Sequence, residues 1–237
     1  MSPTGSPIHN GARLQLQPIF PEPITVPGNV ARIPYRDRVR FVRRVVVGQA
    51  MVVAFLGLLP ITVGLPGPKV DLLVLVIGLL SLSLVRAVLR TGSLESVLSW
   101  IAMIPTGVGL AGLAQSAQSH GFPVWLWALP SVLAGVYALA CGHDFSYTGM
   151  ASLGVAASAV VLIMAFALGR VGATQAWVAF GWSLVCLVYL AYDVSMIVKR
   201  RRPGEEATAV ADQFRDTVNW TTYPVRVAAH WRKFRFF

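Results

Sequence analysis

Three aspartates near the C-terminal end of the sequence are the residues most able to do chemistry: Asp193, Asp212 and Asp216. Asp193 lies in an apolar run, and Asp212 and Asp216 are four residues apart, so they share one face of a helix. Carboxyl groups within membrane segments are rare, and they commonly mark ion pathways or proton relays. If the surrounding elements cross a membrane, these aspartates are candidates for binding a proton or a cation.

Each aspartate also has a purely structural interpretation. Asp193 lies near the end of its apolar run and could reach the membrane interface or pair with Lys199 or Arg200. Its short side chain makes a long reach difficult. Asp212 and Asp216 could lie on the solvated face of an amphipathic helix. Both interpretations stay open when the residues are considered alone.

The other seven of the ten acidic residues fit structural roles better than chemical ones. Asp71 and Glu95 lie at the starts of expected helices, where a carboxylate interacts favourably with the positive end of the helix dipole. Asp144 follows His143 in an expected loop, and one such pair is more typical of solvated surface than of a metal site. The rest lie in the N-terminal tail or in a charged loop: Glu22, Asp37, Glu205 and Glu206. We expect no bound cofactor.

The composition indicates that these residues are surrounded by a membrane. Of the 237 residues, 55% are apolar and 13% are charged, whereas soluble domains contain roughly 25% charged residues. Seven of the twenty basic residues precede the first apolar run, and nine follow the last one. Because membrane orientation explains this distribution, we expect the lipid bilayer and not a nucleic acid as the partner. The two cysteines, Cys141 and Cys186, form no metal-ligand pattern.

Six apolar segments lie between residues 45 and 198. Each is long enough, at about 1.5 Å per residue, to span a hydrocarbon layer of ~30 Å. Only a helix satisfies the backbone hydrogen bonds of such a segment in lipid. The expected helices are 45–65, 70–89, 96–117, 122–142, 148–168 and 174–198. The sequence therefore predicts an all-α polytopic membrane protein.

The chain divides into two tails and one membrane domain. Residues 1–44 form a basic, proline-rich tail that we expect to be flexible, residues 45–229 form the transmembrane domain, and residues 230–237 form a short basic tail. With a cytosolic N-terminus, thirteen basic residues of the N-terminal tail and the loops lie on the cytosolic side. Only Lys69 and Arg170 then lie on the other side, so the positive-inside rule favours this orientation.

The segment 207–229 is semi-polar, because it combines apolar residues with Asp212, Arg215 and Asp216. It is too polar to face lipid, but it fits the centre of a helical bundle or a re-entrant position on the cytosolic side. The basic residues that follow it favour a cytosolic C-terminus, and a full seventh crossing would place them on the opposite side.

Four short strings carry a resemblance to a known family. Residues 192–198 read YDVSMIV and residues 212–219 read DQFRDTVN; upstream, residues 41–45 read FVRRV, followed by Gln49, and residues 143–146 read HDFS. Together they resemble the Bax inhibitor motif family of calcium-leak membrane proteins over about residues 36–220. That family has an aromatic-Asp-Thr-Gln-x-x-Ile string on its sixth helix and Asp-Leu-Phe-x-Asp-Phe-Ile on a semi-polar seventh helix. The separation of 23 positions from Asp193 to Asp216 is close to the family's usual value.

This resemblance implies seven transmembrane helices, with the semi-polar seventh in the centre of the bundle. It also implies a slow, pH-sensitive leak of Ca²⁺ from internal stores such as the endoplasmic reticulum or Golgi, which protects the cell from apoptosis. In this interpretation Asp193 and Asp216 form a latch: a shared proton holds two helices together, and deprotonation separates them and offers oxygen ligands to Ca²⁺ in transit. Asp212 would line the cytosolic mouth. Arg86 would be the basic partner of Asp193 or, alternatively, an interface anchor.

The sequence also departs from the family pattern. The Thr-Gln pair is Val194 and Ser195 here, and the family's glutamate within the third helix is absent from the stretch that reads Ile104-Pro105-Thr106-Gly107. Gating details that involve the third helix therefore do not carry over. The compact length and the divergence fit viral members of the family, such as those of cytomegaloviruses.

Two functions other than the leak are compatible with parts of the sequence. Tyr192 and Asp193 also resemble the Tyr-Asp pair of intramembrane aspartyl proteases, but Asp212 and Asp216 lack the Gly-x-Gly that precedes the second aspartate of those enzymes. No hydrolase, zinc or nucleotide-binding string occurs in the sequence either, so we expect no enzyme. The second function is a non-transporting adaptor that binds apoptosis-related or other membrane proteins through its tails or small-residue helix faces. An adaptor should tolerate Asp193→Asn, whereas a leak with this latch should not.

Overall fold

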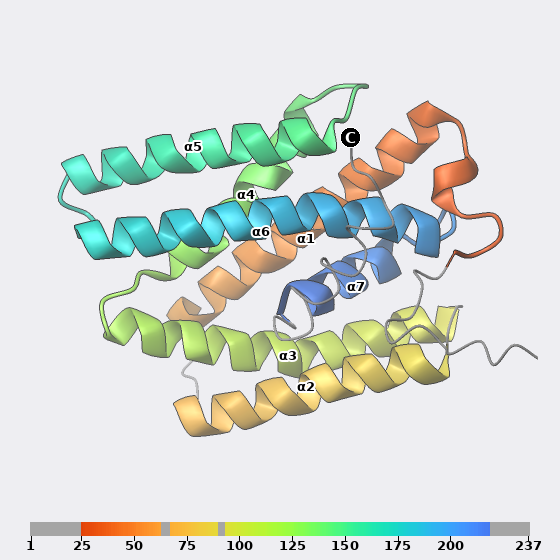
Figure 1. Ribbon diagram of the computed structural model, residues 1–237. Helices are drawn as coiled ribbons and strands as arrows, with labels where there is room; N and C mark the ends of the chain where they lie inside the picture. The colour runs from red at the N-terminus through yellow and green to blue at the C-terminus, as the bar shows by residue number, and fades with distance from the viewer. Residues whose placement is uncertain (1–24, 63–66, 90–92, 219–237) are drawn as a thin grey trace, which may run out of the picture.

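The structure, a computed structural model, describes residues 25–62, 67–89 and 93–218, and these residues form helices without strands (Figure 1). The elements are η1 (Val30–Arg32), α1 (Tyr35–Thr62), α2 (Pro68–Val88), α3 (Ser93–Ser119), α4 (Val124–Ala140), α5 (Tyr147–Ala167), α6 (Ala173–Arg200) and α7 (Glu206–Val218). Within these described ranges, five helices are long and apolar enough to cross a membrane, and α4 is a shorter apolar helix. The prediction of an all-α polytopic membrane protein is thus confirmed.

The outer surface of the bundle is apolar, as a lipid-facing surface must be. Leu80 on α2, Ile104 on α3 and Ile163 on α5 are all exposed. Soluble monomers rarely expose such extensive apolar surface, whereas lipid accommodates it.

The six predicted apolar segments correspond to α1–α6, and the main difference is at the start of α1. This helix begins at Tyr35 and not at residue 45, so residues 35–44 belong to a helix and not to the tail. The main hydrophobic core consists mostly of buried residues of α1, α4, α5, α6 and α7, and it includes Val39, Phe41 and Val42 of α1. This packing extends the helix past its charged residues. Residues 25–34 of the predicted N-terminal tail precede α1 and contain η1, whereas residues 1–24 and 230–237 of the predicted tails lie outside the described residues.

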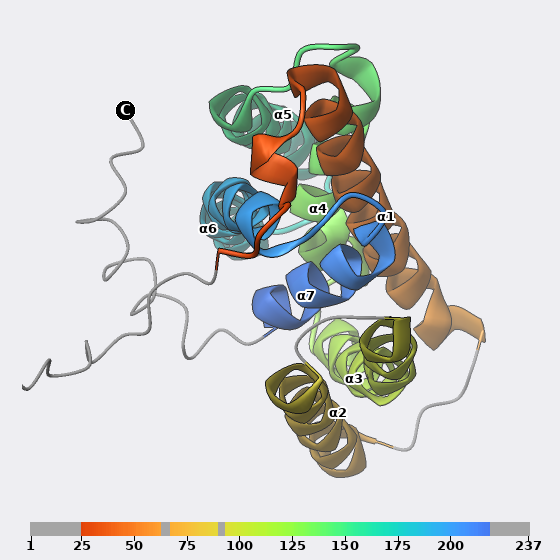
Figure 2. The ribbon, with the colours of Figure 1, turned by 90° about the vertical axis from the view of Figure 1, so that its right-hand side faces the viewer.

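Helix α7 lies at the centre of the bundle, where it contacts α1, α3 and α6 (Figure 2). Its residues from Thr208 to Asp216 are all buried, which confirms the predicted central position of the semi-polar helix. The described part has 13 residues, or about 20 Å at the usual helical rise. It therefore enters the bundle from the side at which α6 ends, and its continuation lies outside the described residues.

Helices α2 and α3 pack closely because a glycine of each helix, Gly78 and Gly109, lies against the other helix. A Cβ atom on Gly109 would lie 2.5 Å from the backbone nitrogen of Leu75 and 2.5 Å from the backbone oxygen of Asp71. Gly78 lies against Thr106 in the same way. The first turn of α3 carries Glu95, which contacts Arg201 just after the end of α6.

We expect Gly109→Ala to lower the melting temperature of the protein in detergent micelles. Overpacking a tight contact typically costs about 1–3 kcal/mol, and here backbone atoms would have to move. Gly181→Ala is the matched control, because nothing lies within 4 Å of its added Cβ atom on α6. The control should leave the melting temperature unchanged or raise it, since alanine favours a helix over glycine by about 1 kcal/mol. Equal melting temperatures for the two variants would contradict this packing.

Candidate functional site: a buried ion-pair cluster beside a membrane cavity

A cluster of buried charged side chains lies where α3 begins, α6 ends and α7 enters the bundle. We call it the ion-pair cluster. Its members are Glu95 on α3, Asp193 and Arg200 on α6, Arg201 in the following loop, and Asp212, Arg215 and Asp216 on α7. Each side chain is at most 9% exposed. Buried charges are costly unless they are paired, so the geometry of the pairing matters.

Arg201 connects three elements of the bundle. Its guanidinium donates two hydrogen bonds to the Glu95 carboxylate, at 2.8 and 2.9 Å, and its Nε donates to Asp212 Oδ2 at 2.9 Å. Burial lowers the pKa of Arg201, but the hydrogen bonds and charges of Glu95 and Asp212 outweigh burial and raise the pKa above its usual range. The guanidinium therefore stays charged and ties α3 to α7 through the end of α6.

The backbone of this loop is held by the segment that precedes α1. Val30 N–H donates a hydrogen bond to the Arg201 carbonyl at 2.9 Å, and Val26 N–H donates to the Lys199 carbonyl at 3.1 Å. Val30 is fully buried in the main core. These contacts fix the backbone from which the Arg201 side chain extends.

A second set of ion pairs lies farther along α7, around Asp216. Arg215 donates to Asp216 Oδ1 from Nε at 2.9 Å, and its Nη1 lies 3.5 Å from Asp212 Oδ1. From α6, Arg200 donates to Asp216 Oδ2 at 3.5 Å. The two arginines therefore link the predicted aspartates of α7 to each other and to α6.

Asp193 faces this second set from the buried side of α6. It is 2% exposed, and its Oδ2 atom has no hydrogen-bond partner within the described ranges. Its electrostatic interactions involve Asp216, Arg200, Asp212 and Arg215. Asp193 on α6 and Asp216 on α7 thus occupy one buried environment, with guanidinium groups beside them.

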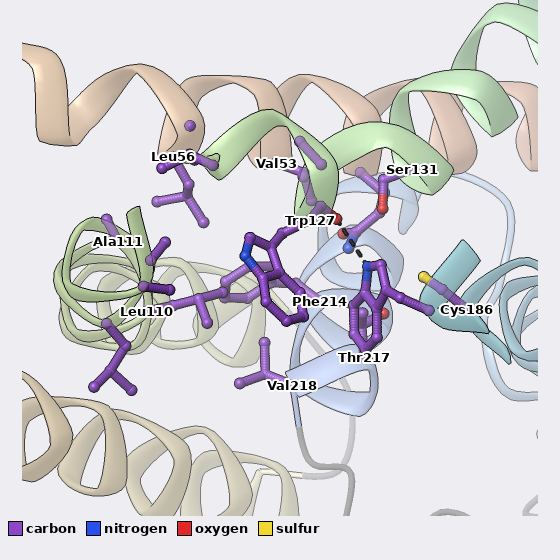
Figure 3. Close-up of a pocket in the computed structure, with 18 of the residues that line it drawn as sticks. Val53, Leu56, Leu110, Ala111, Trp127, Ser131, Cys186, Phe214, Thr217 and Val218 are labelled. Carbon is purple, nitrogen blue, oxygen red and sulfur yellow. Dashed lines mark hydrogen bonds between the residues drawn. The ribbon is translucent and has the colours of Figure 1, made fainter. Parts of the chain in front are cut away.

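The other face of α7 borders a cavity of about 480 Å³ (Figure 3). Phe214, Thr217 and Val218 of α7 line it, whereas Asp212, Arg215 and Asp216 belong to the ion-pair cluster. Helices α1, α2, α3, α4 and α6 supply the remaining walls, which are mostly apolar. Helix α7 is therefore an amphipathic wall between the cavity and the cluster.

Comparison with known proteins identifies no relative. The chain matches no known family, no curated protein and no solved structure. The site is therefore interpreted from its own geometry.

The structure brings together three of the four predicted site residues. Asp193, Asp212 and Asp216 all lie in the ion-pair cluster, and Asp212 is buried there between Arg201 and Arg215. The side chain of Arg86 lies outside the described residues, although its backbone belongs to α2. In the described part of the chain, no three His, Cys, Asp or Glu side chains are arranged to hold a metal ion.

Sequence reasoning missed Glu95 and Arg201. Glu95 does lie in the first turn of α3, as expected for a carboxylate at a helix start, but it also binds Arg201. Arg201 belongs to a run of four basic residues that the sequence shows only as an orientation signal. The one available signal was that a glutamate at the start of an apolar segment needs a partner when it is buried.

Proposed function

We propose that the protein is a pH-sensitive calcium leak channel of an intracellular membrane, closed by the contact between α6 and α7. The observation that carries the proposal is the burial of Asp193 on α6 and Asp216 on α7 in one electrostatic environment. Buried ionisable residues in membrane helices commonly mark ion and proton pathways. The cavity on the opposite face of α7 supports the proposal, because a displacement of α7 would connect the cavity to the ion-pair cluster.

The proposed gate works through the charges that surround these two aspartates. With one proton between them, Asp193 and Asp216 can lie close together while Arg200 and Arg215 hold Asp216. When the proton leaves, the two carboxylates repel each other and compete for the same guanidinium groups. Repulsion loosens α7 from α6, and the ionised oxygens become ligands for Ca²⁺ in transit. Flux should therefore increase as the pH rises.

The proposed orientation places the N-terminus and the ion-pair cluster at the cytosolic side. The basic residues support it, because they are concentrated in the tails and around the end of α6. The cavity then lies toward the lumen of a store such as the endoplasmic reticulum or Golgi. A leak in this direction lowers the Ca²⁺ content of the store, and protection against apoptosis is the proposed consequence.

The proposal is tested by Ca²⁺ flux into liposomes that contain the purified full chain, measured at pH 6 and pH 8. We expect flux that is larger at pH 8, and we expect Asp193→Asn to abolish the pH dependence. Asp144→Asn is the control, because Asp144 lies in the loop between α4 and α5, where it accepts a hydrogen bond from Tyr35. Absence of flux from folded protein in every form would favour the non-transporting adaptor.

A further inference from the structure

We propose that the cavity beside α7 binds a neutral amphiphile, whose head group pairs with Gln49 and whose alkyl chain fills the apolar part. The head group is one that both donates and accepts a hydrogen bond, as a carboxamide or a protonated carboxyl group does. This proposal goes beyond the calcium leak and does not depend on it, since binding can be measured without any flux.

The cavity has the size and lining of a small-molecule site. Its volume of about 480 Å³ lies within the roughly 300–1,000 Å³ of most ligand pockets, which are apolar with a few polar groups. Trp127 and Trp182, whose rings meet edge to face, form part of its wall at α4 and α6. None of the described residues that line it carries a charge. An alkyl chain suits this lining, and an ionised head group does not.

Gln49 is the polar group that indicates a ligand. It lines the cavity from α1, its side chain is fully buried, and neither its amide nitrogen nor its amide oxygen has a hydrogen-bond partner among the described residues. Leaving such a buried amide unpaired is unfavourable. A primary amide offers two donors and one acceptor, so its best complement is a group with a neighbouring acceptor and donor.

The positions of the lining residues define where the chain would lie. On α1 the cavity runs from Gln49 to Gly57, a distance of about 12 Å along the helix axis. Its Gly57 end lies at the start of α4, because Val124 lines the cavity and its side chain would lie 3.8 Å from a Cβ atom on Gly57. A head group on Gln49 would therefore direct an alkyl chain away from the ion-pair cluster and along α1 toward α4.

The test uses a photoreactive octadecanamide that carries a diazirine in its chain, added to the full chain in phospholipid nanodiscs. Cross-linked residues are located by mass spectrometry of peptides. We expect adducts on cavity residues of different helices, such as Val53, Leu110 and Trp182. Excess octadecanamide should remove them, whereas octadecane, which has no head group, should not. Adducts confined to lipid-facing residues such as Leu80 and Ile104 would overturn the proposal.

Gln49→Leu should reduce the cavity adducts about tenfold, which is the effect of losing one hydrogen bond of ordinary net strength. Gln213→Leu is the matched control, because Gln213 is equally buried and equally unpaired in the described structure but does not line the cavity. Neither change removes a hydrogen bond made within the described structure, so both variants should fold. Equal labelling of the two variants would exclude Gln49 as the head-group site.

Competition by octadecanoic acid distinguishes the two head groups. The acid should displace the probe at pH 5, where its carboxyl group is protonated, and should fail at pH 9, whereas octadecanamide should compete at both pH values. Stronger competition by the acid at pH 9 would mean that the cavity accepts an anion, which would overturn the neutral pairing with Gln49.

Discussion

Replacing Arg201 with alanine is expected to lower the free energy of unfolding by about 3–5 kcal/mol, because it takes away the guanidinium that binds the buried Glu95 carboxylate and one of the guanidinium groups beside Asp212. The Glu95 and Asp212 side chains are at most 5% exposed, and Arg201 donates hydrogen bonds to both. Without the guanidinium, either the two carboxylates stay charged in a poorly solvating environment or they must take up protons. The measurement is chemical unfolding in detergent micelles, followed by circular dichroism.

The neighbouring arginine provides the control for Arg201. Arg202 is exposed, and its side chain donates one hydrogen bond, to the Pro27 carbonyl at 3.3 Å. Arg202→Ala should therefore change stability by no more than about 0.5 kcal/mol. Arg201→Lys should lower the free energy of unfolding by less than Arg201→Ala and by more than Arg202→Ala. Lysine keeps the charge but cannot make the bidentate contact with Glu95. If Arg201→Ala is no more destabilising than Arg202→Ala, the ion-pair cluster does not hold the bundle together.

The second large effect is expected in the flux assay, where Asp216→Asn should make Ca²⁺ flux the same at pH 6 and pH 8. Asparagine keeps the size of aspartate but cannot lose a proton, so the repulsion with Asp193 that would open the gate never develops. The ion pairs of Arg200 and Arg215 with residue 216 are weakened as well. Melting temperatures measured in parallel show whether the variant remains folded.

Glu206→Gln is the control for Asp216→Asn on the same helix. Glu206 lies in the first turn of α7 and pairs with Arg44 at 3.2 Å, in a position where both side chains are partly exposed. Exposed pairs of this kind contribute about 0–1 kcal/mol, so flux and its pH dependence should be retained. A pH dependence that persists unchanged in Asp216→Asn would exclude the aspartate latch as the gate.

The apolar pattern of the sequence predicted the six apolar helices α1–α6 well, because in lipid the length and hydropathy of a segment determine its conformation. It also identified Asp193, Asp212 and Asp216, since an aspartate among apolar residues needs a special environment. The contact between Glu95 and Arg201 was not predictable in this way. The two residues are 106 positions apart, and each already has a local explanation, as a helix start and as part of a basic run.

Asp71, which packs against the C-terminal part of α3, is a second residue whose tertiary contacts the sequence does not predict. The sequence explains it by its position in the first turn of α2, where the structure does place it. Its side chain is nevertheless buried against Gly112, and its Oδ1 atom has no partner among the described residues. Which face of a helix start is covered by a neighbouring helix depends on tertiary packing, and a single sequence does not reveal it.

The hydrogen bonds between the segment before α1 and the end of α6 impose an order on the biogenesis of the protein. Val26 and Val30 are synthesised long before Lys199 and Arg201, the residues whose carbonyls they bind. Because a chain is made from its N-terminus, these bonds can form only after six helices have left the ribosome. Glu95 likewise has no contact with Arg201 until Arg201 has been synthesised. Assembly of the bundle therefore finishes in one late step, in which the segment before α1, the end of α6 and α7 dock together.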